Sequence, residues 1–199
     1  RGDDLLRGVA EVVGGDDRQS AVGEDVLALL HVGAFEADHQ GILEMHLARR
    51  GVDSVFTYRA NQAEAAEVTR LAAEAGRKAI ALQLDTGDTA QFDGFVGEVR
   101  KALAALGAER FDYLVNNAGT SHHGPIAETT EEDMDSLYRV HFKGVFFLTQ
   151  KLLPLINDGG RIVNISSGLT RFSFAGSAPY ASMKGAVERD RNGGSSTIP

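Results

Sequence analysis

The chain has 199 residues, 43% of them hydrophobic and 24% charged, with a formal net charge of −8. At this length a single domain is expected, and the absence of cysteine excludes both a disulfide framework and a thiolate-rich zinc site. The acidic balance argues against nucleic-acid binding. The short apolar runs and the lack of a signal-peptide core predict a cytoplasmic protein that does not enter the membrane.

The acidity is concentrated at the start of the chain. Residues 1–46 contain ten of the 28 acidic residues and three arginines, so nearly all of the net charge lies in the first quarter. We therefore interpret residues 1–46 as an atypical acidic N-terminal part of one domain that covers residues 1–188. Either chance clustering on a solvated face or a segment of different origin accounts for this asymmetry. Residues 189–199 are polar and glycine-rich, and a disordered tail is expected there.

From residue 47 onward, predicted strands alternate with predicted helices. β-Branched and apolar runs predict strands at residues 54–58, 78–84, 111–115 and 161–165, with residues 26–32 as the candidate for a preceding strand. Apolar residues at helical spacing predict helices at 61–75, 89–106 and 131–156, the last interrupted near Gly144, and a final helix from about Tyr180. This alternation predicts an α/β fold with a Rossmann-like, doubly wound parallel sheet and helices on both faces. Ligands of such sheets bind at the carboxyl ends of the strands, so the residues that follow each strand are candidate ligand contacts.

Small and amide residues follow the third of these strands. The run Asn116-Asn117-Ala118-Gly119 lets a flat ligand approach the backbone closely, and its Asn amides can tie neighbouring strands together. An ordinary loop also favours Asn and Gly, so these residues alone do not separate the two interpretations.

A serine, a tyrosine and a lysine are placed to share one site. Ser167 lies just beyond the strand at 161–165, and Tyr180 and Lys184 occupy positions i and i+4 of the final helix, on one helical face. A lysine cation near a phenol lowers the phenol pKa from about 10 toward neutrality, which a general acid or base requires. A nearby serine hydroxyl can donate a hydrogen bond to a carbonyl oxygen as charge develops on it.

Together these motifs resemble the short-chain dehydrogenase/reductase family. The resemblance is carried by residues 116–119, by Arg-Ile-Val-Asn-Ile-Ser-Ser at 161–167, by Tyr-Ala-Ser-Met-Lys at 180–184 and by the helical run at 142–150, and it extends over about residues 47–188. It implies a Rossmann-type fold, a nicotinamide cofactor and NAD(P)(H)-dependent hydride transfer between a carbonyl and a secondary alcohol. The implied partners are a small carbonyl or alcohol substrate and further copies of the chain, in a homodimer or homotetramer through the central helices.

The resemblance also implies roles for individual residues. Tyr180 is the expected proton donor or acceptor at the substrate oxygen, Lys184 lowers its pKa and binds the nicotinamide ribose, and Ser167 orients the substrate. Four residues are expected on the adenosine side of the cofactor: Asp85, Asn117, Ala118 and Gly119. His141 stands where the family has an asparagine that helps to hold a proton-relay water. A histidine can also hold a water or relay a proton, and a partly buried structural histidine is the alternative.

The residue after strand 54–58 bears on the choice of cofactor. Arg59 stands there and is preceded by Tyr58 rather than by an acid. An acid would accept a hydrogen bond from a ribose 2′-hydroxyl, whereas an arginine suits a 2′-phosphate. NADP(H) is therefore favoured over NAD(H), and a surface arginine at the end of a strand is the alternative.

The phosphate-binding turn departs from the family pattern. Gly33 occupies the first glycine position of that turn, but Ala37 and His39 stand at the later ones. A pyrophosphate binds bare backbone N–H groups at a helix start, and Glu36 and Asp38 would repel it.

The end of the chain departs from the family as well. Only 15 residues follow Lys184, whereas family members continue through further strands and a substrate-binding loop, so a C-terminally truncated fold is expected. Two functions therefore stay open. One is an NADP(H)-dependent oxidoreductase, and the other is a catalytically impaired or non-enzymatic homologue that acts as a dimerising or binding scaffold. A reading-frame shift in the coding DNA is a further explanation of both flanks.

Two adjacent histidines follow the asparagine motif. His122 and His123 are expected on a loop at the rim of the site. Neighbours in sequence point in different directions, so no metal site is predicted.

Overall fold

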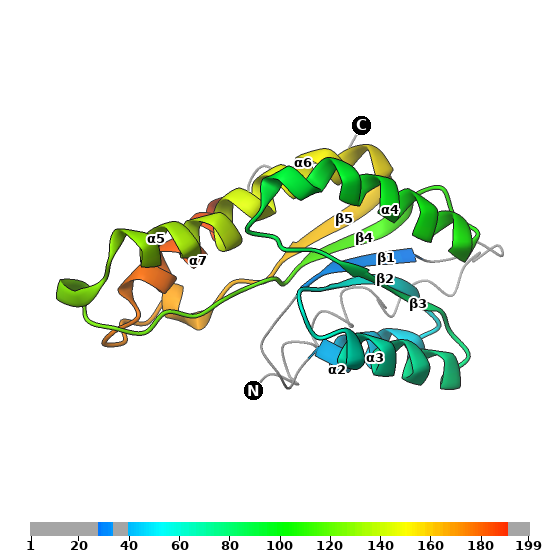
Figure 1. Cartoon of the computed structure of the whole chain (residues 1–199), viewed down its shortest axis with the longest axis horizontal. Helices are drawn as coiled ribbons and strands as arrows, with labels where there is room; N and C mark the ends of the chain where they lie inside the picture. Colours follow the sequence, from blue (N-terminus) through cyan, green and yellow to red (C-terminus); the bar gives the residue numbers. More distant parts are fainter. Residues whose placement is uncertain (1–27, 34–39, 191–199) are drawn as a thin grey trace.

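A computed structural model describes residues 28–33 and 40–190 of the chain (Figure 1). The strands are β1 (Ala28–Val32), β2 (Asp53–Tyr58), β3 (Ala79–Gln83), β4 (Phe111–Asn116) and β5 (Ile156–Asn164). The α-helices are α2 (Gln40–Arg49), α3 (Gln62–Glu74), α4 (Phe92–Leu106), α5 (Glu131–Tyr138), α6 (Val145–Leu152) and α7 (Ala178–Asp190). No helix in these two ranges is long and apolar enough to cross a lipid bilayer. Three predicted features lie outside the described residues: most of the acidic segment (1–27), the later positions of the glycine turn (34–39) and most of the tail (191–199).

The strands of the described residues form one parallel, five-stranded sheet in the order β3-β2-β1-β4-β5. β1 lies in the middle, with Leu30 opposite Val55 on one side and opposite Leu114 on the other. This arrangement confirms the predicted Rossmann-like sheet, including the strand expected within residues 26–32. The order of the strands reverses between β1 and β4, and in open α/β sheets the ligand crevice lies at this reversal, outside the carboxyl ends of the strands.

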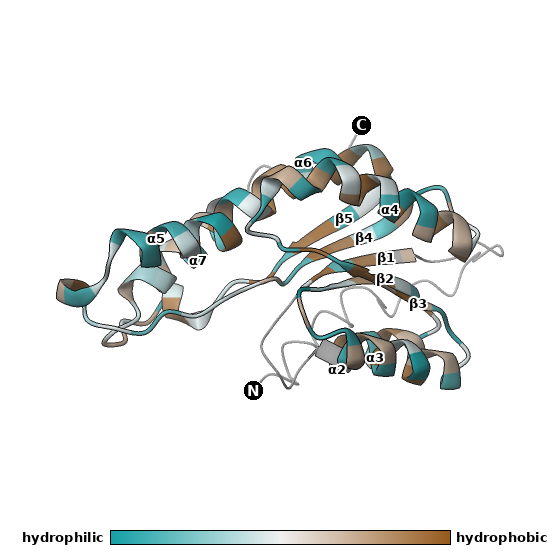
Figure 2. Ribbon diagram, viewed as in Figure 1, coloured by the Kyte–Doolittle hydropathy of each residue, from teal (hydrophilic) through white to brown (hydrophobic). Residues whose placement is uncertain are grey.

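Helices cover both faces of the sheet, as predicted. α2 and α3 lie along one face, and α4 and α6 lie along the other (Figure 1). Successive residues of a strand point to opposite faces, so β4 contributes to both cores. Leu114 packs on the side of α4 and α6, whereas Tyr113 and Val115 pack with Leu43 and Leu47 of α2. Figure 2 shows mainly hydrophobic residues along the strands, as expected for a sheet that is covered on both sides.

The helical region predicted at 131–156 forms with the predicted interruption near Gly144. α5 begins with a capping box between Thr130 and Asp133, and the winding then widens into a π-helix, η3 (Arg139–Gly144), before α6 begins. A Cβ at Gly144 would lie 2.2 Å from the backbone oxygen of Thr86. Only glycine therefore allows this helix to approach the loop after β3 so closely.

The ends of three elements differ from the prediction. The helix gives way at the turn Leu153–Leu155, which contains Pro154, and β5 starts at Ile156 rather than at 161. The register with β4 shifts between Phe111 and Tyr113, which accommodates the polar, glycine-rich residues 157–160. Those residues show no apolar alternation, so the strand pattern did not extend to them. α7 continues through Asp190, so the first two residues of the predicted tail are helical.

Candidate active site

Most of the predicted site residues follow the ends of strands, and the common strand direction brings these ends to one edge of the sheet. Gly33 follows β1, Arg59 follows β2, and Asn117 follows β4. Asp85 and Ser167 come shortly after β3 and β5. The sheet therefore gathers along one edge residues that are far apart in the sequence.

Tyr180 stands in the first turn of α7, half-buried beside Ser167. Burial raises the pKa of Tyr180 above its ordinary value of 10.0, and a hydrogen bond with Ser167 acts in the opposite direction. Ser167 begins the short turn η5 (Gly168–Thr170), where its Oγ accepts a hydrogen bond from the Leu169 N–H at 3.3 Å. The hydroxyl proton of Ser167 is thus available to Tyr180 or to a bound oxygen.

Lys184 lies one helical turn beyond Tyr180 and is buried, with 5% of its surface exposed. Its Nζ donates to the backbone carbonyl of Ile165 at 2.9 Å and lies 5.8 Å from the centre of the Tyr180 ring. Burial lowers the pKa of Lys184 to about 8. The expected lowering of the Tyr180 pKa by this cation is not the net result here, because burial of the phenol outweighs the groups that favour its ionised form.

His141 lies in η3, is almost fully buried, and meets the Tyr180 ring edge-on. Its Nε2 lies 2.7 Å from the carbonyl oxygen and 3.2 Å from the backbone nitrogen of Thr120, and the shorter of these contacts assigns the ring proton to Nε2, which donates to the carbonyl. Burial, and then the charge of Lys184, lower the pKa of His141 to about 4, so the ring is neutral at physiological pH. Its Nδ1 is consequently an acceptor, and it is buried without a hydrogen-bond partner among the described residues.

The run 116–119 ties β4 to both of its neighbours, as predicted for its amides. Asn116 Nδ2 donates to Asn164 Oδ1 of β5 at 2.8 Å. The backbone N–H groups of Asn117 and Ala118 both donate to the carbonyl of Val32, each at 2.8 Å. These bonds hold the backbone of the motif against the end of β1, where the strand order reverses.

The remaining adenosine-side candidates are accessible at the same edge. Arg59 is exposed, and its backbone carbonyl accepts a hydrogen bond from Gln83 Nε2 at 3.0 Å. Asp85 is half-buried, and its Oδ1 accepts from the Gly87 N–H at 2.8 Å. Gly119 is half-buried directly after the bonded part of the motif.

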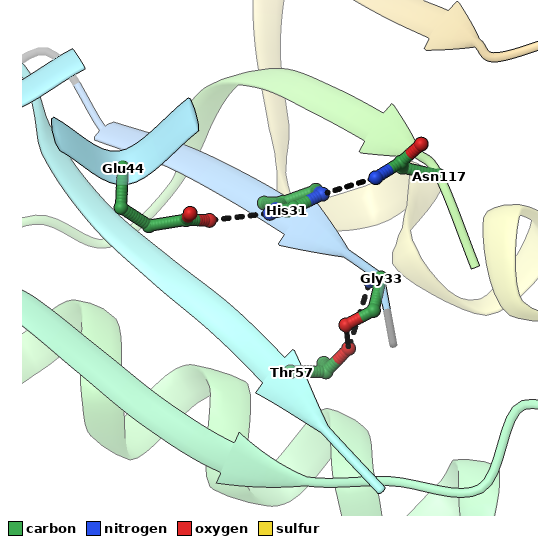
Figure 3. A network of polar contacts seen from close by, with 5 residues as sticks. All are labelled: His31, Gly33, Glu44, Thr57 and Asn117. Carbon is green, nitrogen blue, oxygen red and sulfur yellow. Dashed lines mark hydrogen bonds and ion pairs between the residues drawn. The ribbon is translucent and has the colours of Figure 1, made fainter. Parts of the chain in front are cut away.

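The sequence reasoning missed His31 and Glu44 as site residues (Figure 3). His31 of β1 is 2% exposed and Glu44 of α2 is 1% exposed, and Nδ1 of the histidine is hydrogen-bonded to Oε1 of the glutamate. On its other side His31 Nε2 lies 3.2 Å from Asn117 Nδ2. Glu44 was counted with the acids of residues 1–46, and its burial shows that part of this acidity is not on a solvated face. The sequence feature that could have revealed Glu44 is its place next to Leu43, on a helix face that is otherwise apolar.

Glu188, near the end of α7, was also missed. Its Oε1 accepts hydrogen bonds from Ser166 Oγ at 2.8 Å and from Thr170 Oγ1 at 2.9 Å. These two residues flank Ser167 on both sides. Glu188 therefore ties the Ser167 turn to the helix that carries Tyr180.

The polar groups at this edge fit a nicotinamide dinucleotide, with Lys184 buried, Asp85 half-buried and Arg59 exposed. Lys184 Nζ keeps two N–H groups after its bond to Ile165, and these suit ribose hydroxyls. The Asp85 carboxylate suits an adenine amine, and the exposed Arg59 guanidinium suits a phosphate. The backbone that would receive the pyrophosphate falls in residues 34–39, outside the described residues.

His122 and His123 have different surroundings. His122 Nδ1 lies 3.4 Å from Asp133 Oδ1, whereas the His123 ring lies 6.2 Å from the ring of Phe174. Within residues 28–33 and 40–190, no group of three or more His, Asp or Glu side chains is placed to hold a metal ion.

Related proteins are similar in sequence to this chain over most of its length. It is 37% identical over 141 residues to an uncharacterized oxidoreductase of Methylorubrum extorquens, covering 71% of this chain and 55% of that protein. It is 32% identical over 160 residues to a hydroxynaphthalene reductase-like protein of Metarhizium brunneum, covering 80% of this chain and 58% of that protein. The chain thus spans a little over half the length of these curated relatives.

Solved structures share the fold. The angucycline C-6 ketoreductase LanV, with bound NADP, matches with a TM-score of 0.77 and 32% identity, covering 82% of this chain and 64% of that one. Residues 43–189, which are most of the chain, match the short chain dehydrogenase family, and this range contains the ends of β2, β3, β4 and β5. The chain therefore belongs to the short chain dehydrogenase family.

Proposed function

We propose that the chain carries the cofactor-binding and acid–base site of an oxidoreductase that interconverts a small carbonyl compound and a secondary alcohol with NADP(H). The observation that carries this proposal is the convergence of the Ser167 and Tyr180 hydroxyls with the Lys184 ammonium, whose Nζ lies 5.8 Å from the Tyr180 ring centre. Such a set suits proton transfer at one oxygen. Membership of a dehydrogenase family supports the same class of reaction.

A nicotinamide cofactor, when bound, exchanges a hydride with the carbonyl carbon. Tyr180 transfers the proton. Because its pKa lies above 10.0, the hydroxyl stays protonated at neutral pH and can donate to the carbonyl oxygen as negative charge develops there. Ser167 donates a hydrogen bond to the same oxygen, which holds it beside Tyr180.

Lys184 and His141 act on Tyr180 from either side. With a pKa of about 8, Lys184 is mainly cationic at neutral pH and favours the phenolate that remains after Tyr180 has given up its proton. The Nζ–H groups that do not bond to Ile165 remain for ribose hydroxyls. The buried Nδ1 of His141 can accept a hydrogen bond from a water molecule that returns a proton to Tyr180.

The preference for NADP(H) rests on Arg59. Its exposed guanidinium follows β2, where an acid would be needed to accept a hydrogen bond from a ribose 2′-hydroxyl. A guanidinium can instead bind a phosphate with two parallel hydrogen bonds. The bound NADP in LanV supports this choice.

A row of aromatic side chains supports association through the central helices. Tyr138 and Phe142 stack with ring centres 6.0 Å apart, and Phe142 and Phe146 stack at 6.4 Å. Tyr138 and Phe146 are 43% and 44% exposed, so the row presents an apolar face. The second candidate function, a dimerising scaffold without catalysis, draws on this same face.

Cofactor titration separates the two candidate functions. We expect NADPH to bind to the full chain more tightly than NADH, measured by nicotinamide fluorescence. The chain should then oxidise NADPH in the presence of one or more members of a panel of small carbonyl compounds. If neither cofactor binds at millimolar concentration, the oxidoreductase proposal fails and the scaffold remains.

A further inference from the structure

Three polar side chains, two of them buried and that of Asn117 half-buried, form a line beside the end of β1 (Figure 3). Glu44 of α2 is hydrogen-bonded to Nδ1 of His31 on β1. On the other side of the same ring, Nε2 lies 3.2 Å from Nδ2 of Asn117, directly after β4. The line therefore ends at the point where the strand order reverses, at the edge that holds the other site residues.

The chemistry of these groups determines which group donates and which accepts in each of the two hydrogen bonds. The amide nitrogen of Asn117 only donates hydrogen bonds, so the Nε2 that it faces is an acceptor. The ring proton then lies on Nδ1, from which the imidazole donates to Oε1 of Glu44. The amide oxygen Oδ1 of Asn117 is consequently turned away from His31, as Figure 3 shows.

We propose that Glu44 and His31 are positioning residues that make Asn117 present Oδ1, an acceptor, to the ligand. The inference rests on the proposed function, because the ligand it concerns is the cofactor. The group that binds Asn117 must then be a hydrogen-bond donor, which among the polar parts of NADPH means a ribose hydroxyl or an amino group rather than a phosphate oxygen. With the opposite tautomer of His31, the amide would turn over and present Nδ2–H instead.

Close packing around Gly33 keeps the line in place. A Cβ at Gly33 would lie 2.7 Å from His31 Nε2 and 3.3 Å from Asn117 Nδ2, so the imidazole and the amide occupy the space that a side chain would need. The backbone of Gly33 is held as well, because its N–H lies 3.0 Å from Thr57 Oγ1 and its carbonyl 3.3 Å from the same atom. The ring and the amide therefore have little room to rearrange unless the backbone at Gly33 moves as well.

The first test reads the tautomer of His31 directly. Nitrogen NMR spectra of the full chain labelled with ¹⁵N-histidine, with the His31 signals assigned through its backbone, should show a protonated Nδ1 and an unprotonated Nε2. Glu44→Gln should keep this tautomer, because its amide oxygen can still accept from Nδ1–H. Glu44→Leu should lose the preference. A protonated Nε2 in the parent chain, or an unchanged tautomer in Glu44→Leu, overturns the proposal.

The second test measures NADPH affinity in the same proteins by nicotinamide fluorescence. Glu44→Leu should weaken NADPH about fivefold, the effect of one hydrogen bond, and Glu44→Gln should stay within about twofold of the parent. Thr57→Val is the matched control, because it removes the neighbouring contacts to Gly33 and should leave the His31 tautomer unchanged. If Glu44→Leu alters the tautomer but not the affinity, the positioning role is wrong and the proposed function stands. If the parent binds no NADPH, the proposed function and the ligand role of Asn117 fail together, while the NMR result still decides whether the line exists.

Discussion

The ring of His141 meets the ring of Tyr180 nearly at a right angle, with centroids 5.3 Å apart and an interplanar angle of 88°. The contact joins the π-helix η3 to α7, and α7 packs against η3 as well as against α5. A titratable ring is thus packed directly against the proposed acid–base residue. Its protonation state affects both the stability of the fold and the surroundings of the phenol.

We expect His141 to make the fold acid-sensitive. Its pKa is about 4 when folded, against an ordinary value of 6.5, so between these values the unfolded chain binds a proton that the folded chain excludes. Stability is therefore fully present above pH 6.5 and falls as the pH drops toward 4, by up to about 3 kcal/mol. His141→Asn should lose this part of the pH dependence in urea unfolding at pH 7 and pH 4.5. His123→Asn, an exposed control, should keep it, and equal pH dependence in His141→Asn and the parent would contradict the prediction.

Lys184 should govern the alkaline limit of activity. Its pKa of about 8 means that the ammonium loses its charge as the pH rises through that value, while Tyr180, with a pKa above 10.0, remains protonated. We therefore expect kcat/KM for carbonyl reduction to decline as the pH rises through about 8, since this parameter reports groups of the free enzyme. The measurement is a pH profile from 6.5 to about 10. A plateau across pH 8 would remove Lys184 from its assigned role.

Replacing Tyr180 with Phe separates proton transfer from binding. The variant keeps the ring that packs against His141 but loses the hydroxyl, so turnover should fall by about 100-fold or more. NADPH affinity, measured by fluorescence, should change little. Ser182→Ala, which alters an exposed hydroxyl on the same helix, is the matched control and should retain activity. Equal turnover in Tyr180→Phe and the parent would refute the acid–base role.

Arg59→Ala tests the cofactor preference. Loss of a charge-assisted contact to a 2′-phosphate should weaken NADPH about tenfold and leave NADH almost unchanged. Arg70→Ala removes the same charge from the middle of α3, where Arg70 pairs with Glu67 and Glu74. This control should affect neither cofactor. Equal losses for NADPH and NADH in Arg59→Ala would reverse the assignment to NADP(H).

The aromatic row on the central helices should hold copies of the chain together. Phe146→Glu places a charge in this row and should convert the expected dimer or tetramer to a monomer, measured by light scattering during gel filtration. Phe172→Glu introduces the same charge at a side chain that is 71% exposed outside the row, and it should leave the assembly intact. A monomeric parent, or equal dissociation of both variants, would contradict an interface at this row.

The sequence predicts most of the fold because its signals are local. Apolar runs such as Tyr113 to Val115 mark strands that are covered on both faces, and the spacing of Tyr180 and Lys184 places both on one side of a helix. The start of β5 was not predictable, because residues 157–160, where the register with β4 shifts, carry no apolar pattern.

The sequence predicts which residues meet at the site better than it predicts their burial and pKa values. Spacing brings Lys184 near Tyr180, but the depth of burial that raises the Tyr180 pKa depends on how α7 packs against η3. The pairing of His31 with Glu44 joins a strand to a helix, and neither residue belongs to a recognisable motif. Their partnership depends on both being enclosed, which only the folded arrangement shows.

The π-helix at Arg139–Gly144 also determines how this region can change during evolution. Such a segment accommodates one more residue per turn than the flanking α-helices. Deleting one residue there would return the helix to regular winding and leave the following half facing nearly the same way, because the wider turn already absorbs the extra residue. His141 and Phe146 face opposite surroundings, one packed inside and one partly exposed. A single-codon deletion in the π-helix would therefore leave Phe146 facing nearly as it does, whereas the same deletion in α5 would turn it by about 100°.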